Sequence, residues 1–143
     1  MSVNTAAELY AGLQETFSKV ITEGEAALYA GLVGDNRPQV HNSLLAAEET
    51  PPRLTVHPLF LVGIIGGLLN TRIPGEGSQC ITMQYEFLAP VYCGDRIDTV
   101  IELAAIDPAK HLATFRTNSY NQDKNQVITG QAVMLVPTQV LPH

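Results

Sequence analysis

Residues 54–71 of this chain read LTVHPLFLVGIIGGLLNT, a stretch without a single Asp, Glu, Lys or Arg. Its length approaches the roughly 20 apolar residues that a membrane-spanning helix requires. His57, Pro58, Asn70 and three glycines within it argue against a membrane span. Its apolar residues recur at helical spacing and occupy the opposite face as well, so the stretch predicts a helix that begins at Pro58 and is buried inside the protein.

The sequence around this helix predicts strands. Apolar and polar residues alternate in four segments, with turn-forming residues between them: 79–88, 95–106, 111–121 and 126–136. One more strand is expected at 14–22, followed by a short helix that ends near Gly34. Thr22 and Glu25 have the spacing of a capping box at the start of that helix. The order of elements indicates the α+β class, with an antiparallel sheet wrapped around the long apolar helix.

The central helix also bears on assembly. One sheet covers only one side of a helix that is apolar all round, so we expect a homodimer or a higher oligomer to cover the rest. Gly63, Gly66 and Gly67 lack side chains and permit a close approach to the helix. Either a core strand or a thin ligand chain is expected to make that approach.

Length and charge exclude several classes of protein. The 143 residues are expected to form one domain spanning 1–143, and 8 Lys and Arg against 14 Asp and Glu give a net charge of −6. Nucleic-acid binding is not expected, because it depends on clustered basic residues. Met1–Tyr10 shows no signal peptide, and we expect Cys80 and Cys93 to be reduced thiols of a cytoplasmic protein that is not inserted in a membrane.

The candidate catalytic groups lie in the polar loop 34–42. Asp35 and His41 place a carboxylate and an imidazole on one loop, where the two groups can share a proton transfer. The sequence contains no HExxH motif, CxxC pair, GxSxG elbow or glycine-rich phosphate loop. We therefore expect neither a metal nor a cofactor.

Three stretches together resemble one known family. Residues 34–41 (GDNRPQVH) are similar to its hydratase motif, residues 56–59 (VHPL) to the start of its central helix, and residues 88–95 (LAPVYCGD) to a segment that joins two strands. Over about residues 14–137 the chain resembles the MaoC-like, (R)-specific enoyl-CoA hydratases, which have the hot-dog fold. A single MaoC-like hot-dog domain is the expected architecture.

The resemblance implies a lyase of fatty acid metabolism that adds water to a 2-enoyl thioester or removes it from a 3-hydroxyacyl thioester. Asp35 and His41 would activate the water and handle the proton. The implied partner is an acyl-CoA or acyl-carrier-protein thioester, whose acyl chain would lie along the central helix toward Gly66. The start of that helix would polarise the thioester carbonyl, because its free amides and dipole favour a developing negative oxygen.

The chain departs from the family pattern at the site itself. One extra residue separates Asp35 from His41, and Arg37 stands where the motif has asparagine unless Asn36 takes that place. Pro58 replaces the glycine whose N–H is the oxyanion donor, and proline has no N–H. Loss of one such donor typically costs about 10²–10³ in rate. We expect the side chain of His57 or the N–H of Leu59 to substitute, and Gly66 stands where a substrate-contacting serine is frequent.

Two other functions remain open from the sequence. The same fold hosts several chemistries, so an acyl-CoA thioesterase or a non-catalytic acyl-thioester-binding subunit are alternatives to the hydratase. Candidate contacts for CoA phosphates are Arg53, Arg72, Lys110 and Arg116, although the usual location of such residues is a solvated surface.

Overall fold

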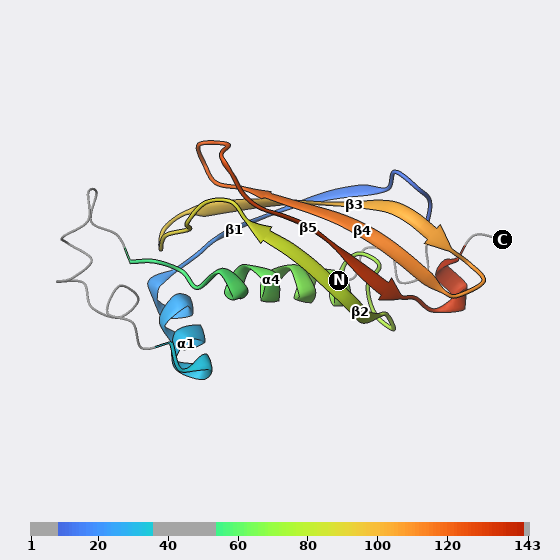
Figure 1. Ribbon diagram of the computed structural model, residues 1–143, viewed down its shortest axis with the longest axis horizontal. Coiled ribbons are helices and arrows are strands. Elements are labelled where there is room, and N and C mark those ends of the chain that lie inside the picture. Colours follow the sequence, from blue (N-terminus) through green and yellow to red (C-terminus); the bar gives the residue numbers. More distant parts are fainter. Residues whose placement is uncertain (1–8, 36–53, 142–143) are drawn as a thin grey trace.

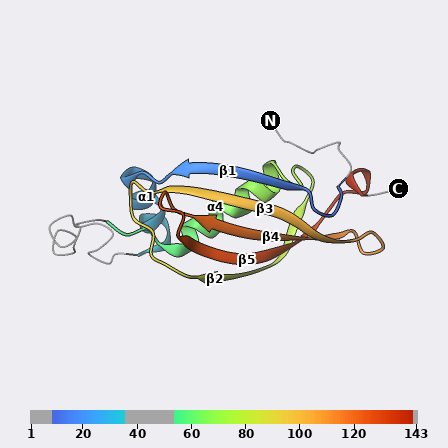
Figure 2. The same cartoon turned by 90° about the horizontal axis from the view of Figure 1, so that it is seen from above.

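The computed structural model describes residues 9–35 and 54–141, and there it has the expected α+β architecture. Five strands form one antiparallel sheet in the order β1-β3-β4-β5-β2. The sheet curves over one side of helix α4 (Pro58–Thr71), and the shorter helix α1 (Glu23–Val33) lies beside the start of α4 (Figures 1 and 2). The strands are β1 (Gln14–Val20), β2 (Gln79–Phe87), β3 (Arg96–Asp107), β4 (Leu112–Tyr120) and β5 (Gln126–Leu135).

The elements expected within the described residues are confirmed, with ends that shift by a few residues. The structure adds a short 3-10 turn at Thr138–Val140 that the sequence did not predict. No helix among the described residues is long and apolar enough to cross a membrane.

The core lies between α4 and the inner face of the sheet. Alternate residues of β3 and β4 are buried, as the period of two of a strand requires. On α4 the buried residues are Leu61, Ile65 and Leu69, which share one helical face. Within this single chain the other side of the helix is open, since Leu59 is 51% exposed, as expected of a helix that one sheet covers on one side only.

Helix α1 is fixed at both ends by its own sequence. The capping box is present: Thr22 Oγ1 accepts from the Glu25 N–H at 3.2 Å, and Glu25 Oε1 accepts from the Thr22 N–H at 3.3 Å. Hydrogen bonds from Lys19, then from Thr22, lower the pKa of Glu25 to about 2. Gly34 ends the helix with a φ of 76°, a conformation that glycine adopts without strain.

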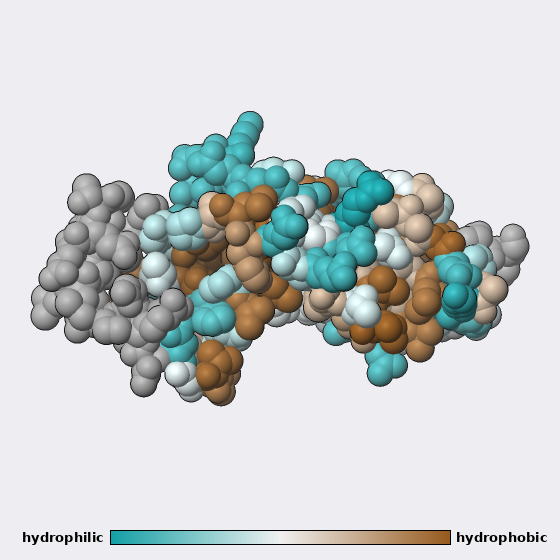
Figure 3. Space-filling view, viewed as in Figure 1, coloured by the Kyte–Doolittle hydropathy of each residue, from teal (hydrophilic) through white to brown (hydrophobic). Residues whose placement is uncertain are grey.

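The free side of α1 is apolar. Figure 3 shows apolar atoms at the end of this helix, and its exposed apolar residues are Leu28, Leu32 and Val33. A helix with so little contact on that side is held mainly by its caps and by its packing against the start of α4.

The segment 88–95 connects β2, at one edge of the sheet, to β3 near the other edge. Asp95 is buried, and its carboxylate accepts from the Tyr92 N–H at 3.0 Å and from Gln122 Nε2 at 3.1 Å. The neighbouring Gly94 donates its N–H to the Ile21 carbonyl at 2.7 Å. The Gly-Asp pair therefore stabilises the connection between β2 and β3 and joins it to the beginning of α1.

Gly130 allows strand β5 to lie in close contact with strand β2 and with the Tyr85 ring. Gly130 on β5 lies opposite Tyr85 on β2 and Thr117 on β4. A Cβ at this position would overlap the Gln84 carbonyl oxygen and the Tyr85 ring. The Tyr85 ring thus covers β5 at Gly130, and its hydroxyl reaches Thr117 Oγ1 at 3.5 Å.

Gly130→Ala should lower the free energy of unfolding by about 1–3 kcal/mol, because the added methyl forces the backbone or the Tyr85 ring to move. Urea denaturation followed by circular dichroism measures the change. Gly31→Ala in α1 is the matched control, since its Cβ meets nothing within 4 Å, and it should raise stability by about 0.5–1 kcal/mol. Equal effects of the two substitutions would contradict the close contact.

Candidate active site

Two of the family-like stretches meet directly in the structure. The Val56 N–H donates to the Val91 carbonyl at 2.9 Å, and the Cys93 N–H donates to the Leu54 carbonyl at 2.9 Å. These bonds hold residues 54–56 beside the 88–95 segment and determine where the chain enters α4. His57 follows at once and is the N-cap residue of the helix.

His57 caps the helix with its ring. Nδ1 of His57 accepts a hydrogen bond from the Leu59 N–H at 3.1 Å. A ring nitrogen that accepts cannot carry a proton, so the neutral imidazole bears its hydrogen on Nε2. His57 therefore satisfies one backbone donor of the helix and keeps a second, side-chain donor.

The first three helical residues of α4 offer no free amide for an oxyanion. Pro58 has no N–H, the Leu59 N–H is held by His57 Nδ1, and the Phe60 N–H donates to the His57 carbonyl at 3.0 Å. Of the two substitutes expected from the sequence, the Leu59 N–H is already bonded. The Nε2–H of His57 is the donor that the cap leaves for a ligand.

Tyr29 of α1 restrains this imidazole. The ring centroids of Tyr29 and His57 are 5.7 Å apart, and Tyr29 packs edge-on against Phe60 at 5.3 Å. Aromatic pairs at these distances attract and orient one another. This contact was not predictable from the sequence, because Tyr29 occupies an ordinary helical position.

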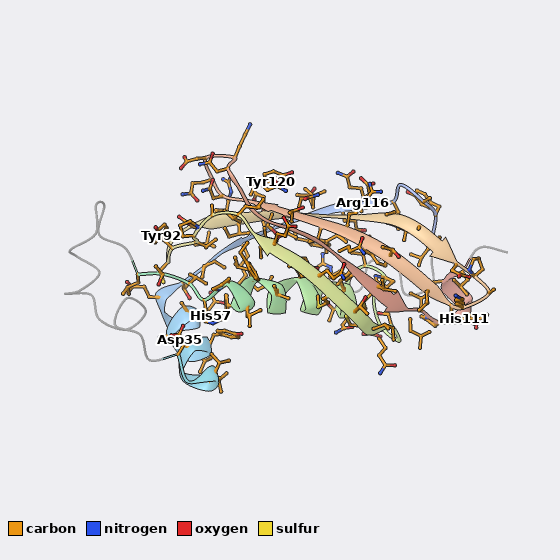
Figure 4. The ribbon with its side chains drawn as sticks, in the orientation of Figure 1. Asp35, His57, Tyr92, His111, Arg116 and Tyr120 are labelled. Atoms are coloured by element: carbon orange, nitrogen blue, oxygen red, sulfur yellow. The ribbon has the colours of Figure 1, made fainter. Side chains whose placement is uncertain are left out.

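Asp35 lies at the same junction. It directly follows the Gly34 cap, and its N–H donates to the Ala30 carbonyl at 2.9 Å. Figure 4 shows Asp35 and His57 where the end of α1 comes beside the beginning of α4. The other expected catalytic residue, His41, lies outside the described residues.

A cavity of about 360 Å³ flanks the start of α4. Its lining is apolar, which suits an acyl chain rather than a charged ligand. The residues around it are Thr55, Val56, Pro58, Leu61, Val127 and 87–91.

The helix glycines differ in their surroundings. No described atom comes within 4 Å of a Cβ built on Gly63 or Gly67. A Cβ on Gly66 meets the side chain of Met83, on strand β2, at 4.0 Å, so among the described residues a core strand comes near Gly66 alone. The open surface along these glycines leaves room for a ligand chain or a second subunit.

The remaining reactive groups do not form a second centre. Burial raises the pKa of both thiols, Cys80 and Cys93, so neither is activated as a nucleophile. Within the described ranges, no group of three or more His, Cys, Asp or Glu residues is placed to hold a metal ion.

No family model matches the chain, but curated proteins match it over 90–93% of its length. It is 31% identical over 133 residues to the (R)-specific enoyl-CoA hydratase of Aeromonas caviae, covering 93% of this chain and 99% of that protein. The chain belongs to the MaoC-like, (R)-specific enoyl-CoA hydratase family.

Two further comparisons agree with this family. The 3-hydroxybutyryl-CoA dehydratase of Methylorubrum extorquens is 32% identical over 131 residues, covering 91% of this chain and 82% of that protein. The solved (R)-hydratase of A. caviae superposes with a TM-score of 0.85 at 31% identity, covering 90% of this chain and 98% of that chain. The hot-dog fold expected from the resemblance is thereby confirmed.

His57→Ala should lower the free energy of unfolding by about 0.5–2 kcal/mol, the usual cost of a lost N-cap. His57→Ser should keep most of that stability, because serine caps the same N–H. Urea denaturation of the two variants beside the wild type measures the difference. If alanine and serine at this position cost the same, the ring does not cap the helix.

Proposed function

We propose that this protein is a hydro-lyase that adds water across the double bond of a trans-2-enoyl thioester, or removes it from a 3-hydroxyacyl thioester. The match to an (R)-specific enoyl-CoA hydratase over 93% of this chain is the observation that carries this proposal. The match to a 3-hydroxybutyryl-CoA dehydratase supports the reverse direction of the same reaction. The substrate is an acyl-CoA, with an acyl-carrier-protein thioester as the other source of the same group.

Asp35 and His41 are the proposed catalytic pair. Together they hold one water, whose oxygen bonds to C3 of the enoyl group while a proton reaches C2, so the elements of water are added across the double bond. The position of Asp35 beside the start of α4 supports this role, because the thioester carbonyl is to be bound there. A carboxylate and an imidazole suit this task, since both exchange protons near neutral pH when a site shifts their affinity.

His57 is the proposed oxyanion donor. Proton delivery to C2 passes through a state in which the thioester oxygen gains negative charge, and a fixed donor stabilises that charge. Pro58 removes the usual amide, and the cap occupies the Leu59 N–H, so the Nε2–H of His57 takes the role. The positive end of the α4 dipole adds to the effect. Gly66, about two turns further along the helix than Pro58, is proposed as a further substrate-binding residue.

The test is an assay with purified protein and crotonyl-CoA, with enoyl absorbance and free thiol recorded in parallel. Loss of enoyl absorbance without thiol release is expected. Asp35→Asn and His41→Ala should each reduce kcat/KM by at least about 10²-fold, as removal of a general acid or base does. Thiol release would indicate a thioesterase, and turnover of neither kind would indicate a non-catalytic binding subunit.

The His57 variants refine the assay. His57→Ser keeps the cap but loses the imidazole donor, so kcat should fall about 10²–10³-fold while the fold stays intact. Full activity in His57→Ser would remove the imidazole from the oxyanion site.

We also propose that the protein is a homodimer joined through β2. The sheet order leaves β2 at one edge, where Ile81 is 50% exposed and Phe87 is 46% exposed. A free edge with apolar side chains pairs readily with an identical edge, in a two-fold arrangement. The other edge, β1, exposes one large apolar residue, Val20 at 52%. A dimer of this kind also brings a second subunit toward the exposed side of α4.

Ile81→Lys should convert the dimer to a monomer, because two like charges would meet across the two-fold axis. Sedimentation velocity or light scattering gives the mass. Val20→Lys is the matched control on the opposite edge and should leave the mass unchanged. A wild-type monomer, or dissociation caused by Val20→Lys alone, would contradict the β2 interface.

Single-domain organisation over residues 1–143 and a cytoplasmic location complete the proposal. The free thiols of Cys80 and Cys93 support a reducing compartment.

A further inference from the structure

A second cavity lies on the other flank of α4, between this helix and β1. Its volume is about 440 Å³, within the range of small-molecule sites. Helix residues Leu61, Ile64, Leu68 and Arg72 form one wall, in a row that runs from near the beginning of α4 to its end. Leu61 also lines the cavity at the start of α4, so the two cavities share one side chain.

The opposite wall comes from the inner face of the sheet. It is apolar at Phe17 and Ile97, and the buried hydroxyls of Thr99 and Ser119 bond to each other at 2.8 Å. An aliphatic chain therefore finds apolar contacts on both sides, and the hydroxyls of Thr99 and Ser119 are already bonded to each other.

The charged residues of the lining have one sign. They are Lys19 and Arg72, in a chain whose acidic residues outnumber its basic ones 14 to 8. Lys19 is paired with Glu25 at 2.6 Å, whereas Arg72 forms no ion pair with any described residue. Arg72 is thus the positively charged residue of this cavity that can pair with an anionic ligand.

Arg72 is held in place but not satisfied. Its N–H donates to the Leu68 carbonyl at 2.8 Å, and its guanidinium carbon lies 5.2 Å from the centroid of the Phe17 ring. Stacking on an aromatic face orients the planar group. Nε is buried and has no hydrogen-bond partner in the described part of the chain. Arg72 is therefore half-buried, and its Nε is shielded from solvent.

A purely structural role explains part of this arrangement. A cation at the end of α4 is favourable for the helix dipole, and the guanidinium contributes packing on Phe17. Glu15 interacts with Arg72 electrostatically, although burial is the larger influence and raises the pKa of that carboxyl. None of these contacts gives the buried Nε–H an acceptor, which costs free energy unless a ligand supplies one.

We infer that this cavity receives the far end of an acyl chain whose last carbon is a carboxylate, and that Arg72 binds that carboxylate. Nε and one terminal nitrogen of a guanidinium form a planar pair of donors that matches a carboxylate. The inference rests on the proposed function, because it takes the thioester end of the same molecule to lie at the start of α4. The substrate class is then the mono-thioester of a dicarboxylic acid.

The row of helix residues indicates the chain length. Leu61 and Arg72 are eleven residues apart, which corresponds to about 16 Å along a helix. An extended chain advances about 1.2 Å per bond, so about 13 bonds cover that distance. When the bond to the oxygen at each end is counted, a chain of twelve carbons has about thirteen bonds and covers the length of this row.

The experiment measures binding separately from catalysis. Isothermal titration calorimetry compares two saturated thioesters, dodecanoyl-CoA and dodecanedioyl-CoA, which the enzyme cannot hydrate. Wild type should bind dodecanedioyl-CoA about tenfold or more tightly, the usual gain from a hydrogen bond to a charged group. Arg72→Gln should abolish this preference. Arg116→Gln, which removes an equal charge from the outer face of the sheet (Figure 4), should retain it.

Ile64→Phe gives a second test that does not alter a charge. The larger ring fills the cavity, so the affinity for dodecanoyl-CoA relative to butyryl-CoA should fall about tenfold. Equal affinities of wild type for the two C12 thioesters, or a preference that survives Arg72→Gln, would overturn the inference. Hydration of crotonyl-CoA, measured separately, reports on the proposed function alone, so the two failures are distinguishable.

Discussion

The burial of one face of α4 against the sheet is the contact on which the rest of the molecule depends. Leu61, Ile65 and Leu69 are spaced by one turn each and are almost fully buried, so the helix axis must run along the sheet rather than across its edge. Fully burying such side chains contributes roughly 1.5–3 kcal/mol each. With the axis in this direction, the beginning of α4 lies beside α1 and its end lies beside Phe17 of β1.

Pro58 affects both the stability of α4 and the donors available at the candidate site. A proline at the first helical position favours the helix, because its backbone angle already fits. The same residue removes an amide donor from the place where the family uses one. His57 connects the two effects, since its Nδ1 caps the helix and thereby leaves the hydrogen on Nε2. The imidazole that stabilises the helix is therefore also the proposed oxyanion donor.

Local patterns in the sequence were enough to predict most of the fold. The alternation in 95–106 and 111–121, the Thr22 and Glu25 capping box and the charge-free stretch 54–71 each act within a few residues. The site was predictable only as a set of residue types. Tyr29 of α1 contacts His57 at the start of α4. Position 130 on β5 must be glycine because the Tyr85 ring of β2 lies against it. Such contacts depend on how distant elements pack, which no short pattern in one sequence encodes.

The exposed side of α4 follows from the same packing. A sheet can cover only one face of a helix, and Gly63 and Gly67 face away from it, with no described atom within 4 Å of their Cβ positions. An apolar helix that keeps small residues on its open side can accept a backbone or a ligand chain at close range. Among the described strands β2 forms one edge of the sheet and exposes Ile81, and the proposed dimer places a second subunit there. In that proposed dimer the second subunit encloses the open face of α4, and the two cavities beside Leu61 are what one chain contributes.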